Sequence, residues 1–161
     1  MRYFEDMRVG ERTELGGHTF TAEEIKAFAR RFDPQLFHLD EAAAARSHFG
    51  RLCASGWHTT AVYMRYFVDS ELREAEHMRA RGETPAKDGP SPGIRELRWT
   101  KPVYAGDTIA FAREILELRE TTGRPGWGLM VARNTATNQD GELVMSFVGA
   151  KFAQRRPPLE H

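Results

Sequence analysis

The sequence predicts an α+β protein in which an antiparallel sheet wraps round a long central helix. A stretch that begins at Gly56 is apolar at helical spacing, whereas beyond residue 93 the apolar residues recur with the period of two that strands require. Because the helix precedes a run of consecutive strands, we expect the sheet to be antiparallel and to pack on the helix.

Three capping residues locate the predicted helices. The first helix should begin after Thr21 and end at Asp33, since the residue before a proline is pushed out of the helical region. A second, short helix should begin after Asp40, which leaves a loop between Asp33 and Asp40. Ser55 can cap the long helix, which runs to about Arg81. Its first half is apolar on most sides, so we expect it to be buried.

The second half of the chain is predicted to form the sheet. Segment 82–93 holds three prolines and three glycines, which indicates a flexible excursion, either a lid or a loop. Strands are expected over residues 94–103, 108–118, 127–137 and 142–154, the first two joined through 104–107 and the last two through 138–141, with an edge strand around 11–15. Pairing of exposed edges between two copies would protect them, so we expect a homodimer or higher homo-oligomer.

The composition is that of one soluble globular domain, which we expect to span residues 1–156. Of 161 residues, 40% are apolar and 29% are charged, and 23 basic residues balance 23 acidic ones. This balance gives no reason to expect a nucleic-acid partner. Residues 157–161 are expected to form a tail, and Leu159 to His161 resemble the start of an expression-tag scar.

Cysteine usage and hydropathy predict a cytoplasmic protein without a membrane partner. The single cysteine, Cys53, excludes an internal disulfide, and such a thiol is more often a packed hydrophobe than a nucleophile. No apolar run approaches the roughly 20 residues of a membrane span, and the N-terminus lacks the apolar stretch of a secretory signal.

The pair Asp33 and His38 is the first candidate site. A structural interpretation is a proline turn followed by a buried histidine. The catalytic interpretation is that a carboxylate and an imidazole from one tight loop bind the same water, since histidine exchanges protons near neutral pH. Spacing alone leaves both interpretations open.

The start of the long helix, "ASGWH", is the second candidate site. The first N–H groups of a helix have no acceptor within it, so those of Gly56 and Trp57 should point outward at the positive end of the helix dipole. Such donors can stabilise negative charge that develops on a thioester oxygen. Alternatively, Gly56 only allows close packing.

Other chemistries have weaker support. Ser55 and His58 lack the strand, turn and glycines of a hydrolase nucleophile elbow, and the histidines show no metal-ligand spacing, so we expect no metal. Arg95, Arg98 and Lys101 on a predicted strand could meet a phosphate, although charged residues on a strand usually face solvent.

Three segments together resemble the MaoC-like dehydratases, which include the (R)-specific enoyl-CoA hydratases. They are "FARRFDPQLFHLDEAAA", "FGRLCASGWHTTA" and "GIRELRWTKPVYAGDT", and the resemblance extends over about residues 2–154. It implies a hotdog fold. The spacing of Asp33 and His38 matches that family's signature. Phe32 stands in place of its glycine and Gln35 in place of its asparagine, so the choice of acyl group follows less directly from the resemblance than the reaction type does.

The resemblance implies an (R)-specific hydratase or dehydratase, a lyase acting on enoyl-CoA and 3-hydroxyacyl-CoA thioesters. Asp33 and His38 would activate the water, either one as base, and the Gly56 N–H would bind the thioester oxygen. No cofactor is expected, because coenzyme A is part of the substrate. A hotdog thioesterase and a non-catalytic acyl-CoA binding module are the alternatives. The residues expected to contact the substrate are Gln35, Phe37, Ser55, Trp57, Arg95 and Arg98.

Overall fold

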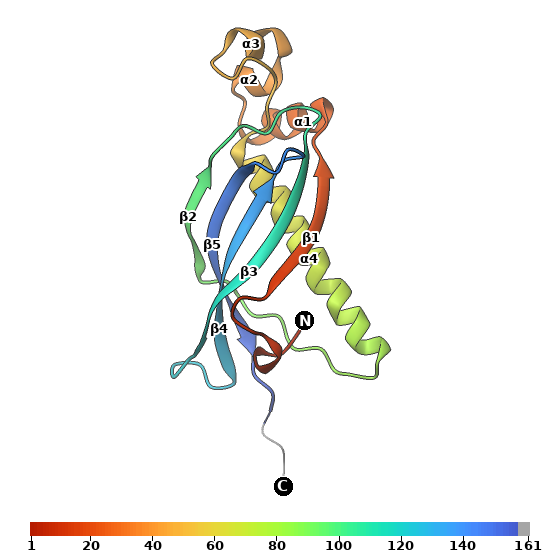
Figure 1. Ribbon diagram of the computed structural model, residues 1–161, viewed down its shortest axis with the longest axis vertical. Coiled ribbons are helices and arrows are strands. Elements are labelled where there is room, and N and C mark those ends of the chain that lie inside the picture. Colours follow the sequence, from red (N-terminus) through yellow and green to blue (C-terminus); the bar gives the residue numbers. More distant parts are fainter. Residues whose placement is uncertain (158–161) are drawn as a thin grey trace.

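The computed structural model describes residues 1–157, so the predicted scar at 159–161 lies outside the described residues. A five-stranded sheet curves around one long helix, and three shorter helices lie together at one end of it (Figure 1). The helices are the 3-10 turn η1 (Phe4–Asp6), α1 (Ala22–Phe32), α2 (Leu36–Leu39), α3 (Glu41–Arg46) and α4 (Gly56–Ala80). The strands are β1 (Arg12–Thr19), β2 (Gly93–Trp99), β3 (Thr108–Glu120), β4 (Trp127–Thr137) and β5 (Leu143–Gln154).

The sheet has the order β1-β3-β4-β5-β2, and every neighbouring pair is antiparallel. This confirms the predicted α+β class, the hotdog arrangement and the N-terminal edge strand. The β4–β5 hairpin also lies where it was predicted. β2 and β3 follow each other in sequence but do not pair: β2 pairs with β5 at the opposite edge, so segment 100–107 crosses the end of the sheet near α1 (Figure 1).

The predicted caps begin three of the helices. Thr21 accepts from the N–H of Glu24 at 3.2 Å, and Asp40 accepts from that of Ala43 at 2.7 Å. The segment between Asp33 and Asp40 is not a plain loop, because it contains the single helical turn α2. This turn directs His38 inward, where only 5% of its surface is exposed.

The main core lies between α4 and the concave face of the sheet. Tyr63 on the helix packs against Phe111 and Phe147 of two strands, with ring centroids 5.9 and 5.1 Å apart. The side of α4 next to β2 is uncovered: Met64 is 47% and Val68 43% exposed, and both border a cavity with Ile94 of β2. The prediction that this half of the helix is buried is therefore wrong for the single chain, because the sheet covers only one side.

Glu71, in the second half of α4, belongs to an ionic cluster that lies between the helix and the sheet. Glu71 accepts from Arg113 at 2.9 Å and from Lys151 at 3.2 Å, and Lys151 also pairs with Asp88 at 2.8 Å. The strands supply the cations and the helix supplies Glu71, so the cluster joins the two layers of the fold.

The segment from Gly82 to Gly93 is fastened to the end of the sheet that lies away from α1, α2 and α3 (Figure 1). Its Ala86 N–H donates to the carbonyl of Met1, and its Pro90 carbonyl accepts from Phe152, both at 3.0 Å. Of the two interpretations of this segment, these contacts fit a loop packed on the sheet better than a lid.

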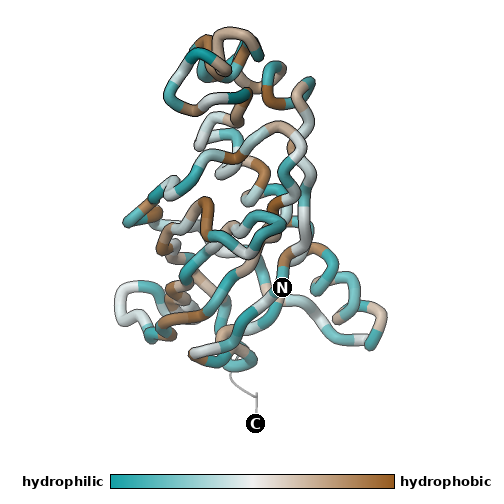
Figure 2. Tube along the Cα trace, turned by 45° about the horizontal axis from the view of Figure 1, so that its top comes forward, coloured by the Kyte–Doolittle hydropathy of each residue, from teal (hydrophilic) through white to brown (hydrophobic). Residues whose placement is uncertain are grey.

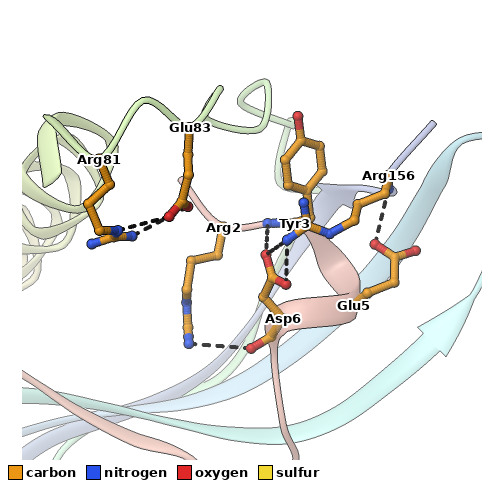
Figure 3. Close-up of polar contacts among 7 residues, drawn as sticks. All are labelled: Arg2, Tyr3, Glu5, Asp6, Arg81, Glu83 and Arg156. Atoms are coloured by element: carbon orange, nitrogen blue, oxygen red, sulfur yellow. Dashed lines mark hydrogen bonds and ion pairs between the residues drawn. The ribbon is translucent and has the colours of Figure 1, made fainter. Parts of the chain in front are cut away.

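Polar contacts at the same end hold η1 to the last described residues (Figure 3). Arg156 donates to both carboxylate oxygens of Asp6 at 2.7 and 2.8 Å, and its guanidinium lies over the ring of Tyr3.

Hydrophobic and hydrophilic residues alternate along the trace (Figure 2), and within residues 1–157 no helix has the length and apolar content needed to cross a membrane.

Candidate active site

The turn after α1 brings Asp33 and His38 together. Asp33 Oδ2 lies 3.5 Å from His38 Nε2, and the two side chains are 20% and 6% exposed. The proline after Asp33 ends α1, and α2 then winds His38 back toward the carboxylate. This separation is short enough for one water molecule to hydrogen-bond both groups.

The other ring nitrogen of His38 contacts the main chain. Nδ1 lies 2.7 Å from the carbonyl oxygen of Cys53. A carbonyl can only accept, so Nδ1 carries the hydrogen, and in the neutral ring Nε2 is left as an acceptor facing Asp33. Burial raises the pKa of the Cys53 thiol to about 11, so this cysteine is an uncharged packing residue here and not a nucleophile.

The carboxylate of Asp33 is held by donors on both sides. The side-chain amide of Gln35 donates to Oδ1 at 2.8 Å. Burial alone would raise the pKa of Asp33, but hydrogen bonds from Ser55 and Gln35 and the charge of His38 outweigh it, so the pKa is lowered. Asp33 is therefore ionised at neutral pH, with Oδ2 directed at His38.

The N-terminus of α4 forms the second half of the site. Ser55 caps the helix, and its hydroxyl accepts from the Trp57 N–H at 3.3 Å, so this donor is already used within the cap. The Gly56 N–H belongs to the same first turn, which has no acceptor inside the helix. A Cβ at Gly56 would lie 2.3 Å from the indole of Trp99, so close packing alone already requires glycine here.

Both halves line one cavity of about 510 Å³. It brings together most of the predicted site residues: Asp33, Gln35, Phe37, His38, Ser55, Gly56 and Trp57. Lys101 also lines it, and sequence reasoning missed Phe49, Trp99 and Val144. Trp99 could have been suspected from the sequence as an aromatic residue near Lys101. Its position over Gly56, however, depends on the pairing of β2 with β5.

The structure does not bring Arg95 and Arg98 to this cavity. Both lie on the edge strand β2, where a register shift falls between them. Arg95 pairs with Glu96 and borders a separate groove with Glu117 and Arg119. Arg98 is exposed, and contact of either arginine with a substrate stays a prediction.

Apart from His38, the histidines of residues 1–157 do not line this cavity. In the part of the chain that the structure describes, no three His, Cys, Asp or Glu side chains gather so that they could hold a metal ion. His58 stacks on Phe28 with ring centroids 4.5 Å apart, and burial lowers its pKa to about 4. His58 is therefore a neutral core residue at physiological pH.

The fold and the site define a hotdog protein with an Asp–His pair beside the start of its central helix. The family described as "FAS1-like, dehydratase domain region" matches residues 7–147. The crystal structure of a MaoC-like dehydratase from Rhodospirillum rubrum is similar at 35% identity and a TM-score of 0.80, covering 96% of this chain and 98% of that one. The chain belongs to the MaoC-like dehydratase family.

Two further relatives are more distant. The mesaconyl-CoA hydratase of Cereibacter sphaeroides is 25% identical over 171 residues, which cover 96% of this chain but only 42% of that protein. The chain thus spans less than half the length of that relative. A conserved hypothetical protein from Mycobacterium tuberculosis with a double hotdog fold is 20% identical with a TM-score of 0.69, over 99% of this chain and 46% of that one, and shows the fold alone.

Proposed function

We propose that this protein is a hydro-lyase that hydrates trans-2-enoyl-CoA thioesters, or dehydrates 3-hydroxyacyl-CoA thioesters. The observation that carries the proposal is the 3.5 Å separation of Asp33 Oδ2 and His38 Nε2 inside a cavity that begins at the N-terminus of α4. The name of the Cereibacter sphaeroides relative, a mesaconyl-CoA hydratase, supports this reaction class. Formation of the (R) hydroxy product is the stereochemistry that the family resemblance implies.

The two side chains favour a bound water as the nucleophile. Asp33 is ionised and His38 Nε2 is an acceptor when the ring is neutral, so one water can donate a hydrogen bond to each. In hydration, the water oxygen bonds to C3 while one of the two groups removes its proton. The protonated group then donates to C2 on the same face, so that H and OH add across the double bond.

Gly56 would act on the other end of the conjugated system. As water attacks C3, negative charge moves to the thioester oxygen, and an N–H at a helix N-terminus can donate to it. A single donor of this kind typically contributes about 3 to 4 kcal/mol of transition-state stabilisation. Because the cap uses the Trp57 N–H, the Gly56 N–H is the donor that this helix end offers.

The active form is expected to be a dimer. The uncovered side of α4 carries Trp57, Met64, Val68 and Leu72, all at least 43% exposed, at the spacing of one helical face. Ile94 on the neighbouring edge strand β2 is 48% exposed. An apolar helix face next to an unpaired strand edge fits a second copy of the same chain, which would cover both. Size-exclusion chromatography with light scattering tests this directly.

The reaction is tested with crotonyl-CoA. Loss of the enoyl absorbance without release of free thiol supports hydration, whereas thiol release would point to a thioesterase. Neither change, together with retained binding of the substrate, would point to a binding module. Asp33→Asn and His38→Ala should each lower kcat by about 10² or more, since general acid–base catalysis typically contributes 10² to 10⁴.

A matched histidine variant separates catalysis from folding. His48→Ala changes an exposed histidine near the site that does not line the cavity, so it should keep hydratase activity. Circular dichroism of each variant checks that the fold is intact. Undiminished activity in both Asp33→Asn and His38→Ala would reject the proposed mechanism.

A further inference from the structure

Two cavities lie along α4, and they are separate. The cavity of about 510 Å³ contains Asp33 and His38. A second cavity of about 280 Å³ lies further along the helix, between α4 and the edge of the sheet at β2. Met64, Phe67 and Ile94 form an apolar part of its wall, and Glu71, Arg113 and Lys151 form a charged part. Met64 and Ile94 belong to the face that a second copy is expected to cover, so this copy would close the cavity on that side. Across residues 1–157, no residue lines both cavities.

Trp99 lines the first cavity and contacts Thr60 and Met145, which lie along α4 and β5 between the residues that line the two cavities. Its indole covers Gly56 at the start of α4, and its Nε1 donates to Oγ1 of Thr60 at 3.2 Å, one turn further along the helix. The Thr60 hydroxyl also lies 3.3 Å from Sδ of Met145 on β5. Indole, hydroxyl and thioether therefore form a wall from the edge strand across α4 to the sheet.

The position of this wall bears on the acyl group. A thioester oxygen bound at the Gly56 N–H fixes the start of the acyl chain at this helix end. Met64, in the second cavity, is eight residues further on, about 12 Å along the helix axis at 1.5 Å per residue. An alkyl chain that grows in this direction meets the indole of Trp99 before it can reach the apolar cavity.

We infer that Trp99 is a specificity-determining residue that restricts the site to short acyl groups by closing it off from the apolar cavity along α4. The inference rests on the proposed function, since it assumes an acyl thioester in the first cavity. Removal of the indole should connect the two cavities and let Met64 and Phe67 contact the end of a longer chain.

The test compares crotonyl-CoA with trans-2-octenoyl-CoA on the wild type and on Trp99→Ala. The ratio of kcat/KM, octenoyl over crotonyl, should rise by about tenfold or more in the variant, because each methylene that becomes buried contributes about fourfold. Trp99→Phe keeps one aromatic ring over Gly56 but loses the Nε1 donor and part of the indole volume, so its ratio should lie between those of the wild type and Trp99→Ala. An unchanged ratio in Trp99→Ala would overturn the inference.

A second pair of variants guards against a merely structural effect. Trp99 is 43% exposed, so its truncation should be tolerated, and Trp99→Leu offers a milder change in the same direction. Phe67→Trp in the Trp99→Ala background should refill the second cavity and reverse the gain for octenoyl-CoA, since Phe67 lines this cavity and is not on the exposed face of α4. A role of Trp99 in folding alone would instead lower activity on both substrates equally, and that outcome also rejects the inference.

Calorimetric titration with saturated butyryl-CoA and octanoyl-CoA separates this inference from the proposed reaction, because binding requires no catalysis. If the wild type binds butyryl-CoA but hydrates no enoyl-CoA, the proposed reaction fails. If octanoyl-CoA then binds more tightly relative to butyryl-CoA in Trp99→Ala than in the wild type, the inference that Trp99 limits acyl length is still supported. If neither thioester binds the wild type, both proposals fail.

Discussion

The side-chain amide of Gln35 donates a hydrogen bond to Oδ1 of Asp33 over 2.8 Å, while Oδ2 of the same carboxylate faces His38. Gln35 stands where the family signature has asparagine, and the longer side chain still reaches the carboxylate from two residues away. Such a bond stabilises the ionised form, and it is one of the causes that lower the pKa of Asp33.

Gln35→Leu should therefore shift the pH dependence of hydration. The pKa of Asp33 rises when a donor to its carboxylate is lost, and the proposed reaction needs this group ionised. The acidic limb of the kcat/KM profile should move to higher pH. At neutral pH the loss should be small, about threefold or less, because a hydrogen bond from an exposed side chain contributes roughly 0.5 kcal/mol. An acidic limb at the same pH in wild type and variant would contradict this role.

His58 should make the protein less stable in mild acid. Burial lowers its pKa from 6.5 to about 4, with His18 adding to this effect and Glu24 opposing it. Between these two pH values the unfolded chain binds a proton that the folded chain does not. The free energy of unfolding should thus fall as the pH is lowered through this window, by on the order of 3 kcal/mol for this residue.

His58→Phe removes the titrating group and keeps an aromatic ring against Phe28. Urea unfolding between pH 7 and 4 should show a flatter pH dependence for this variant than for the wild type. His48→Phe is the matched control, since His48 is exposed and should leave the wild-type slope unchanged. Equal slopes for all three proteins would show that His58 is not the group responsible.

Tyr63→Phe should destabilise the layer between α4 and the sheet. The Tyr63 hydroxyl donates to Oδ1 of Asn134, and both residues are buried. Loss of the hydroxyl leaves a buried acceptor without its donor, which typically costs about 1 to 3 kcal/mol in the free energy of unfolding. Tyr66→Phe is the control, because water can replace its hydroxyl at the exposed carbonyl of Gly17. Equal losses in the two variants would argue against a special role for the buried bond.

Glu71→Gln should be more damaging than a change on the surface of the same helix. Burial alone would raise the pKa of Glu71, but the charges of Lys151 and Arg113 outweigh it and lower the pKa. Removing this carboxylate leaves the buried guanidinium of Arg113 without its ion-pair partner and leaves Lys151 with Asp88 alone, so we expect a loss of about 3 to 5 kcal/mol by denaturant unfolding. Glu76→Gln, on the exposed side of α4, should change stability by less than about 0.5 kcal/mol. Similar values for the two variants would contradict this account of the cluster.

Local signals in the sequence were sufficient for much of the fold. Thr21, Asp40 and Ser55 begin helices where their side chains can cap them, because a cap depends on residues only two or three positions away. The β4–β5 hairpin and the meeting of Asp33 with His38 are also local events. The one-turn helix α2 was missed, since four residues are too few to show helical periodicity.

What the sequence determined by itself was the α+β class, the long helix and the spacing of the Asp33–His38 pair. Only the tertiary structure decided that β2 pairs with β5, that Trp99 therefore covers Gly56, and that Arg95 and Arg98 lie away from the cavity. It also decided which side of α4 the sheet leaves uncovered. These features depend on pairing between segments that are about fifty residues apart, and no pattern within a single helix or strand carries that information.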